Sequence, residues 1–170
     1  MEAVEQRMLL SATPIVSGQT LAGTIVSAGQ KDSYTFTAAA GNTFEVSLGD
    51  ASAASQVKPD LLVYGPDGTQ VGLAFSGGTN TSVRVIYPVP STGAGTYTVI
   101  AQDTNGNATG AYDLELAVAP ATQAPDSDGD GGPIVSGQTK AGMINRTGDL
   151  DIYTFTAAAG NTFEVSLGDA

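Results

Sequence analysis

The stretch YTFTAAAGNTFEVSLGDA runs from Tyr34 to Ala51, and the same eighteen residues return unchanged from Tyr153 to Ala170. Within it, apolar and polar residues alternate on both sides of a turn at Ala40-Gly41-Asn42. Alternation with a period of two is the mark of a strand with one buried face. The side chains that we expect to face inward are Tyr34, Phe36, Ala38, Phe44, Val46 and Leu48.

Further short segments of the same kind follow along the chain, separated by turn residues. They are AGTIV from Ala22, DLLVY from Asp60, TSVRVIYPV from Thr81, GTYTVIAQD from Gly95 and AYDLELAV from Ala111. GPDGTQ predicts a turn, and NGN at Asn105 to Asn107 predicts a hairpin. No segment has a helical period. We therefore predict an all-β fold, an antiparallel β-sandwich that is jelly-roll-like, with about 7–8 strands.

The repeat is wider than the quoted stretch and sets the expected domain organisation. Residues 14–51 align with residues 133–170 at a constant offset of 119, and 30 of the 38 positions are identical. A fixed period indicates tandem copies of one module. The segments that we expect are an N-terminal tail (1–12), a complete module (13–119), an acidic Pro/Gly linker (120–132) and a truncated second copy (133–170). We expect the chain to be part of a larger protein, since ending there leaves half of a core unmade.

Composition excludes several classes of function. The net charge is −11, from 17 acidic and 6 basic residues, so nucleic acid is not an expected partner. There is no cysteine and no histidine, which excludes disulfides and metal sites built on those residues. No apolar run approaches the ~20 residues that span a bilayer.

The residues that enzymes use are absent or badly placed. Without histidine there is no ordinary Ser-His-Asp triad, and Lys31, Lys58 and Lys140 lie in no recognisable motif. Carboxylates that could act in pairs fall on predicted outward faces of strands, where solvated charge is the simpler interpretation. These carboxylates are Glu45, Asp113 and Glu115. We predict that the chain is not an enzyme.

One cluster suggests a metal site. Asp126, Asp128 and Asp130 alternate and are followed by Gly131, like the start of a calcium loop. The twelfth position is Gly137, so the bidentate glutamate is missing. We predict a calcium site at the three aspartates; the alternative is a flexible acidic linker.

Two weaker binding signals have structural alternatives. Asp103, Asn105 and Asn107 could hold a cation, but a hairpin that closes two well-formed strands is the simpler interpretation. Tyr64 and Tyr87 could form part of a carbohydrate platform, although core packing is favoured for both.

Near the N-terminus, VEQRMLLSA resembles the LEPR-type motif Leu-Glu-Pro-Arg-x-Leu-Leu-Ser-Ala of large exported bacterial proteins. The alternative is a chance Leu-Leu-Ser-Ala. Val4 and Gln6 depart from the motif. The matching residues are Glu5, Arg7, Leu9, Leu10, Ser11 and Ala12.

Residues 14–119 are similar to the bacterial pre-peptidase C-terminal domain. The motifs that carry this resemblance are GQKDSYTFTAAAGNTFEVSL, PDLLVYGPDGTQV and AGTYTVIAQDTNGNATGAYDLELAV. The family prefers an acidic GDxDxY, which the second copy has as GDLDIY and the first copy replaces by GQKDSY. Gly65, in place of Asp or Asn, follows Tyr64.

The resemblance implies a non-catalytic accessory or binding module of a large secreted bacterial protein, such as a peptidase. Relatives bind collagen or polysaccharide, so an extracellular matrix protein or a polysaccharide is the partner that the resemblance implies. In collagen-binding relatives calcium binds where the preceding linker meets the sandwich. The alternative function is a structural or adhesive repeat of a cell-surface stalk with calcium-stiffened linkers.

Overall fold

The computed structural model describes residues 12–51, 56–78, 81–121, 123 and 129–169, which form strands and turns without a helix. Asp126 and Asp128 lie outside these residues, as does most of the LEPR-type segment. The strands are β1 (Thr13–Pro14), β2 (Gln19–Ile25), β3 (Lys31–Ala38), β4 (Thr43–Asp50), β5 (Pro59–Tyr64), β6 (Gln70–Phe75), β7 (Ser82–Pro88), β8 (Gly95–Asp103), β9 (Gly110–Ala119), β10 (Gly132–Pro133) and β11 (Tyr153–Thr154).

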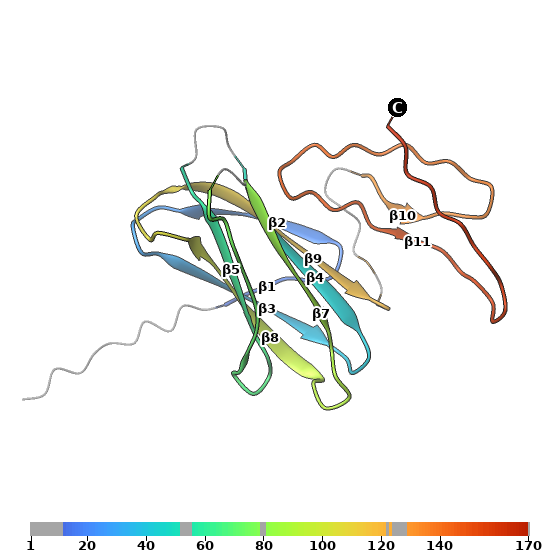
Figure 1. The fold of residues 1–170 in the computed structure, drawn as a ribbon, viewed down its shortest axis with the longest axis horizontal. Helices are drawn as coiled ribbons and strands as arrows, with labels where there is room; N and C mark the ends of the chain where they lie inside the picture. Colours follow the sequence, from blue (N-terminus) through green and yellow to red (C-terminus); the bar gives the residue numbers. More distant parts are fainter. Residues whose placement is uncertain (1–11, 52–55, 79–80, 122, 124–128, 170) are drawn as a thin grey trace, which may run out of the picture.

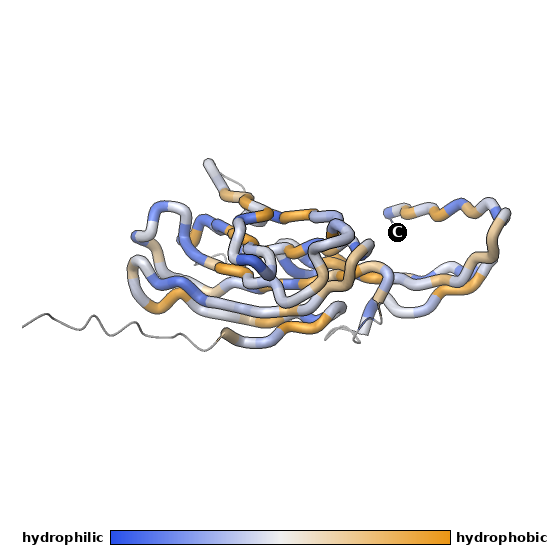
Figure 2. Tube along the Cα trace, turned by 90° about the horizontal axis from the view of Figure 1, so that it is seen from below, coloured by the Kyte–Doolittle hydropathy of each residue, from blue (hydrophilic) through white to orange (hydrophobic). Residues whose placement is uncertain are grey.

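Strands β1 to β9 form two sheets that lie face to face (Figure 1; Figure 2). The larger sheet has the order β1-β3-β8-β5-β6, and the smaller has the order β2-β9-β4-β7. All pairs are antiparallel except β1 with β3, which are parallel. The prediction of an antiparallel β-sandwich is confirmed, whereas the jelly-roll-like topology stays a prediction.

The core lies between the sheets and is built around three aromatic rings. Phe44 contacts Phe36 edge to face, with ring centroids 4.9 Å apart, and Tyr97 at 5.0 Å. Phe36 and Tyr97 stack at 5.4 Å. The inward face predicted for the repeated stretch is confirmed, because all six of its apolar residues are buried. They are Tyr34, Phe36, Ala38, Phe44, Val46 and Leu48.

Two local predictions differ from the structure. Strand β6 was not predicted, because Gly72 interrupts its alternation; a Cβ at Gly72 would collide with Val85, so the close approach requires glycine there. The hairpin predicted at Asn105 to Asn107 is wrong. The turn forms, with Gly106 at φ 65°, but it joins β8 of the larger sheet to β9 of the smaller. It is therefore a corner of the sandwich.

The second copy reproduces the local geometry of the first. β10 pairs with β11 in the register Gly132↔Tyr153, which is the register Thr13↔Tyr34 moved by the repeat offset. Phe155 and Phe163 meet edge to face at 4.8 Å, like Phe36 and Phe44.

No opposing sheet covers the second copy within the described residues. Phe163 and Leu167 are 63% and 99% exposed. In Figure 2 this part of the chain extends past one end of the two layers. Nowhere in the described ranges is there a helix with the length and apolar character needed to cross a membrane.

Candidate functional site: a buried contact between the two copies

The outer face of the smaller sheet carries polar side chains from its two central strands, β4 and β9. Alternation along these strands directs Ser47 and Glu115 outward, and the sequence predicts that Glu115 is a solvated charge. That prediction is wrong: Glu115 is only 4% exposed and Ser47 only 5%. The reason is that residues 145–150 of the second copy lie against this face.

Residues 145–150, which we name the 145–150 turn, have a compact and self-supporting backbone. The amide of Asp149 donates to the carbonyl of Arg146 at 3.3 Å, and the amide of Asn145 donates to Oδ2 of Asp149 at 2.8 Å. Gly148 has a φ of 86°, a conformation that favours glycine. The turn therefore presents a fixed shape to the sheet.

Backbone from the turn fits into a notch made by a glycine of β4. A Cβ built at Gly49 would lie 2.5 Å from the carbonyl carbon of Thr147 and would overlap its oxygen. A Cβ at Gly148 would lie 2.9 Å from Oγ of Ser47 and 3.4 Å from Cα of Gly49. The two surfaces approach so closely because both contribute glycine at the point of contact.

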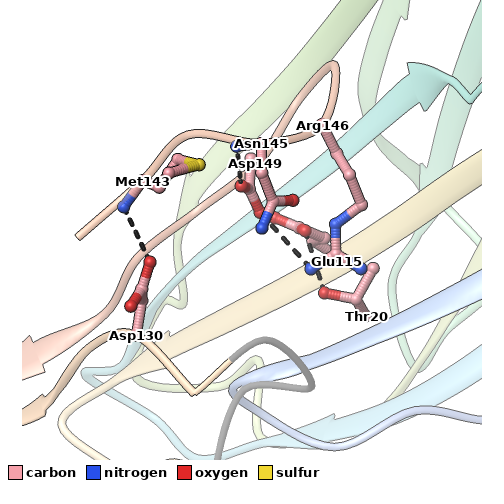
Figure 3. A network of polar contacts seen from close by, with 7 residues as sticks. All are labelled: Thr20, Glu115, Asp130, Met143, Asn145, Arg146 and Asp149. Carbon is pink, nitrogen blue, oxygen red and sulfur yellow. Dashed lines mark hydrogen bonds and ion pairs between the residues drawn. The ribbon is translucent and has the colours of Figure 1, made fainter.

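Charged groups surround this notch. Figure 3 shows Glu115, Arg146 and Asp149 converging, with Thr20 of β2 beside them. Thr20 Oγ1 donates to Oε1 of Glu115 at 2.8 Å, and Arg146 Nη2 lies 3.6 Å from Oδ1 of Asp149. Asp149 is 8% exposed, so the contact buries one carboxyl from each copy.

Burial at the contact raises the pKa values of two carboxyl groups of β9, those of Glu115 and Asp113. Burial raises the pKa of Glu115 to about 7; the Thr20 hydroxyl opposes the shift, and the negative charge of Asp149 adds to it. Burial likewise raises the pKa of Asp113, with Arg146 acting against the shift and Asp149 adding to it. Oε2 of Glu115 accepts no hydrogen bond from the described residues. A proton on that oxygen removes the cost of burying a second anion beside Asp149.

A groove of about 460 Å³ adjoins the contact at the β7 edge of the smaller sheet. Glu45 and Arg84, whose carboxylate and guanidinium groups lie 3.6 Å apart, are among the residues that line it. Phe75 of the first copy and Asp149 and Leu150 of the second also line it, so both copies contribute to it.

Only Asp130 of the three predicted calcium ligands can be placed. Its Oδ2 accepts a hydrogen bond of 2.7 Å from the amide of Met143, shown in Figure 3. Among the residues that the structure describes, no three acidic side chains are grouped closely enough to hold a metal ion. The prediction at Asp126 and Asp128 falls outside the described residues.

The second cation candidate has a structural role. Asp103 is buried, and its carboxylate accepts hydrogen bonds from the amides of Lys58 (2.8 Å), Asn107 (3.0 Å) and Ala108 (3.3 Å). Burial alone would raise the pKa of Asp103, but these donors outweigh it and hold the pKa below its usual range. Asp103 thus stabilises the turn that stands where the sequence predicts a hairpin.

The aromatic residues considered as a platform differ in placement. Tyr87 packs on the core, with its ring 5.4 Å from that of Phe44, as favoured from the sequence. Tyr64 is half-buried, whereas Phe75 on the unpredicted strand β6 is 58% exposed.

Motif residues that carry the family resemblance meet inside the sandwich. Tyr112 donates from its hydroxyl to Oδ2 of Asp32 at 2.5 Å, and its oxygen lies 2.6 Å from the hydroxyl of Tyr34. Tyr34 belongs to the larger sheet and Tyr112 to the smaller. This network therefore ties the two layers together and has a structural role.

Comparisons with known proteins give structural similarity only. No family model matches the chain, and no curated protein matches it. The pre-peptidase C-terminal domain of a Bacillus anthracis collagenase has a TM-score of 0.49 at 15% identity, over 62% of this chain and 93% of that one. A periplasmic inhibitor of g-type lysozyme from Aeromonas hydrophila has a TM-score of 0.46 at 16% identity, over 63% and 95%. The corresponding Salmonella Typhimurium inhibitor has a TM-score of 0.42 at 18% identity, over 63% and 97%. At this level the similarities assign neither a family nor an activity to this chain.

Proposed function

We propose that the chain is a non-catalytic accessory module of a larger secreted bacterial protein, of the pre-peptidase C-terminal kind and used in tandem. Its partner is an extracellular matrix protein or a polysaccharide. One observation carries this proposal. The residues of the resembling motifs, Asp32, Tyr34 and Tyr112, are joined in the network between the sheets. These motif residues hold the two sheets together, and this structural role supports a module that is not catalytic.

Binding and catalysis can be separated with the full chain and insoluble substrates. The chain is incubated with fibrillar collagen and with a panel of polysaccharide particles, and both the bound fraction and the release of soluble fragments are measured. We expect saturable binding to one material without fragment release. Phe44→Ala, which empties the centre of the core, is the control for adsorption that does not need the fold. Fragment release that scales with protein concentration would overturn the non-catalytic assignment, and no saturable binding to any material would overturn the partner class.

The contact between the copies favours a second candidate function. We propose, as the alternative, that the modules are repeats of a cell-surface stalk, in which reach and stiffness are the function. The packing of Gly49 against Thr147 supports this alternative, because it limits movement between consecutive copies. Small-angle scattering of the chain extended by further copies decides between a stiff rod, which supports the stalk, and a flexible string, which contradicts it.

Calcium binding at Asp126, Asp128 and Asp130 is part of both candidates. The donor set suits a hard cation, since it consists of carboxylate oxygens. Without the bidentate twelfth ligand, we expect a modest affinity.

Calcium titration of the full chain by calorimetry tests this site. Asp128→Ala should abolish the binding heat, and Asp169→Asn, which removes an exposed carboxylate elsewhere, should leave it unchanged. Equal heats from the parent chain and Asp128→Ala would remove the site.

A further inference from the structure

The differences between the two copies gather at one place in the fold. Eight of the 38 aligned positions differ, and five of the eight fall within the 145–150 turn. In that turn only Gly148 matches its counterpart, Gly29. The residues that differ there are Asn145, Arg146, Thr147, Asp149 and Leu150, which replace Val26, Ser27, Ala28, Gln30 and Lys31.

Backbone shape does not explain this divergence, because the turn has the same shape in both copies. In the first copy the amide of Gln30 donates to the carbonyl of Ser27 at 3.2 Å, and the amide of Val26 donates to Oε1 of Gln30 at 2.8 Å. These bonds are the counterparts of those made by Asp149 and Asn145. The new residues therefore change what the turn presents to its surroundings.

The side chains of the 145–150 turn are complementary in charge and polarity to the outer face of the smaller sheet. Arg146 brings a positive charge to a face that carries Asp113, Glu115 and Glu45. Leu150 lines the groove beside Phe75, where the first copy has Lys31.

The 145–150 turn is more buried than its counterpart in the first copy, residues 26–31. In the first copy's turn Ser27, Ala28 and Lys31 are exposed, whereas their counterparts Arg146, Thr147 and Leu150 are half-buried. Gln30 is half-buried, and its counterpart Asp149 is buried.

We propose that the 145–150 turn is a docking element and that the outer face of the sheet β2-β9-β4-β7 is its receptor. The partner of this face is thus the following copy of the module, which is held by direct contact as well as by the linker. Gly49 provides the notch for Thr147, and Glu115 with Asp149 forms the buried polar centre. The inference concerns how copies are joined, and it holds whatever the module binds.

Gly49 offers a clean test, because it has no positive φ and the three atoms nearest its ideal Cβ all belong to the docked turn. Gly49→Ala should therefore leave the sandwich intact and block docking. Gly168→Ala is the matched control, since Gly168 is the counterpart of Gly49 in the second copy and its Cβ would meet nothing.

The measurement is NMR of the full chain, with chemical shifts and backbone order parameters for both sides of the contact. In the parent chain and in Gly168→Ala, we expect order parameters of about 0.85 in the 145–150 turn, falling below about 0.6 in Gly49→Ala. The amide chemical shifts of Thr20 and Glu115 should also change in Gly49→Ala, while the shift of Val99, which lies in the other sheet, should stay the same.

A second variant leaves the receptor untouched. It gives the turn the first copy's residues through Asn145→Val, Arg146→Ser, Thr147→Ala, Asp149→Gln and Leu150→Lys, and it should show the same loss of order and the same shifts in Thr20 and Glu115. Unchanged shifts of Thr20 and Glu115 in both variants would overturn the proposal, as would equal effects of Gly49→Ala and Gly168→Ala.

Discussion

At the scale of single residues, the same side chain in the two copies has different surroundings. Phe44 is fully buried at the centre of the sandwich, and its counterpart Phe163 is 63% exposed, although their flanking sequences are identical. Burial is set by the other strands of a module, which only Phe44 has around it among the described residues. The two copies thus place equivalent phenylalanines in two environments, one in the core and one at the surface.

This comparison gives a prediction for stability. Phe44→Ala removes a ring packed against Phe36 and Tyr97 and should lower the free energy of unfolding by about 3–5 kcal/mol. Phe163→Ala should change it by no more than about 0.5 kcal/mol, since exposed positions contribute little. Urea unfolding of the full chain, followed by tyrosine fluorescence, measures both. Equal losses for the two variants would contradict the placement of the core.

At the scale of elements, strand β9 packs against the core on one face and against the 145–150 turn on the other. Its inward residues Leu114 and Leu116 fill the core, while Glu115 between them meets the 145–150 turn on the other side. A buried carboxyl of raised pKa makes this contact sensitive to pH. The charged groups that face Glu115 or share its sheet face are Asp149 and Arg146 from the turn, Asp113 on β9, Glu45 on β4 and Arg84 on β7.

Docking of the turn should weaken as pH rises. Below the usual glutamate pKa of 4.5, Glu115 is protonated in both the docked and the released state, and its contribution to docking is fully present. Between 4.5 and about 7 the released state ionises first, so this contribution of Glu115 to docking is progressively lost; above about 7 none of it remains. The raised pKa of Asp113 acts in the same direction.

Order parameters of residues 145–150 between pH 4 and 8 check this expectation. Glu115→Gln, which keeps the shape and removes the titrating group, should flatten most of the profile. If Glu115→Gln shows the same pH dependence of these order parameters as the parent chain, a group other than Glu115 controls the pH dependence of docking.

At the scale of the whole molecule, two halves of the chain differ in completeness. Residues 13–119 contain both sheets and the described core from Ile15 to Val118. Residues 132–169 contain one two-stranded ladder, and several of their large apolar side chains are exposed. A two-stranded unit is at best marginally stable in water, since three or more strands with an apolar face are needed for independent stability.

Residues 13–119 should therefore fold alone as one cooperative all-β unit. Circular dichroism of this fragment should show a β spectrum and a single thermal transition with coincident probes. Residues 133–170 alone, the matched fragment of the second copy, should show no such transition. Substantial helix in the first fragment, or the lack of a transition, would contradict the domain boundaries.

The sequence by itself determined the sandwich and the inward faces of the strands that alternate clearly, because alternation with a period of two is local and is visible in segments such as Tyr34 to Leu48. It also contained the repeat and the divergence of the 145–150 turn. It did not reveal β6, in which Gly72 interrupts the alternation. Only the tertiary structure decided which sheet each strand joins, so the turn at Asn105 to Asn107 became a corner between sheets. It also decided that Glu115 is buried, since alternation tells which side chains point outward but not what covers them. That cover comes from the 145–150 turn, a distant segment whose position depends on packing between the copies.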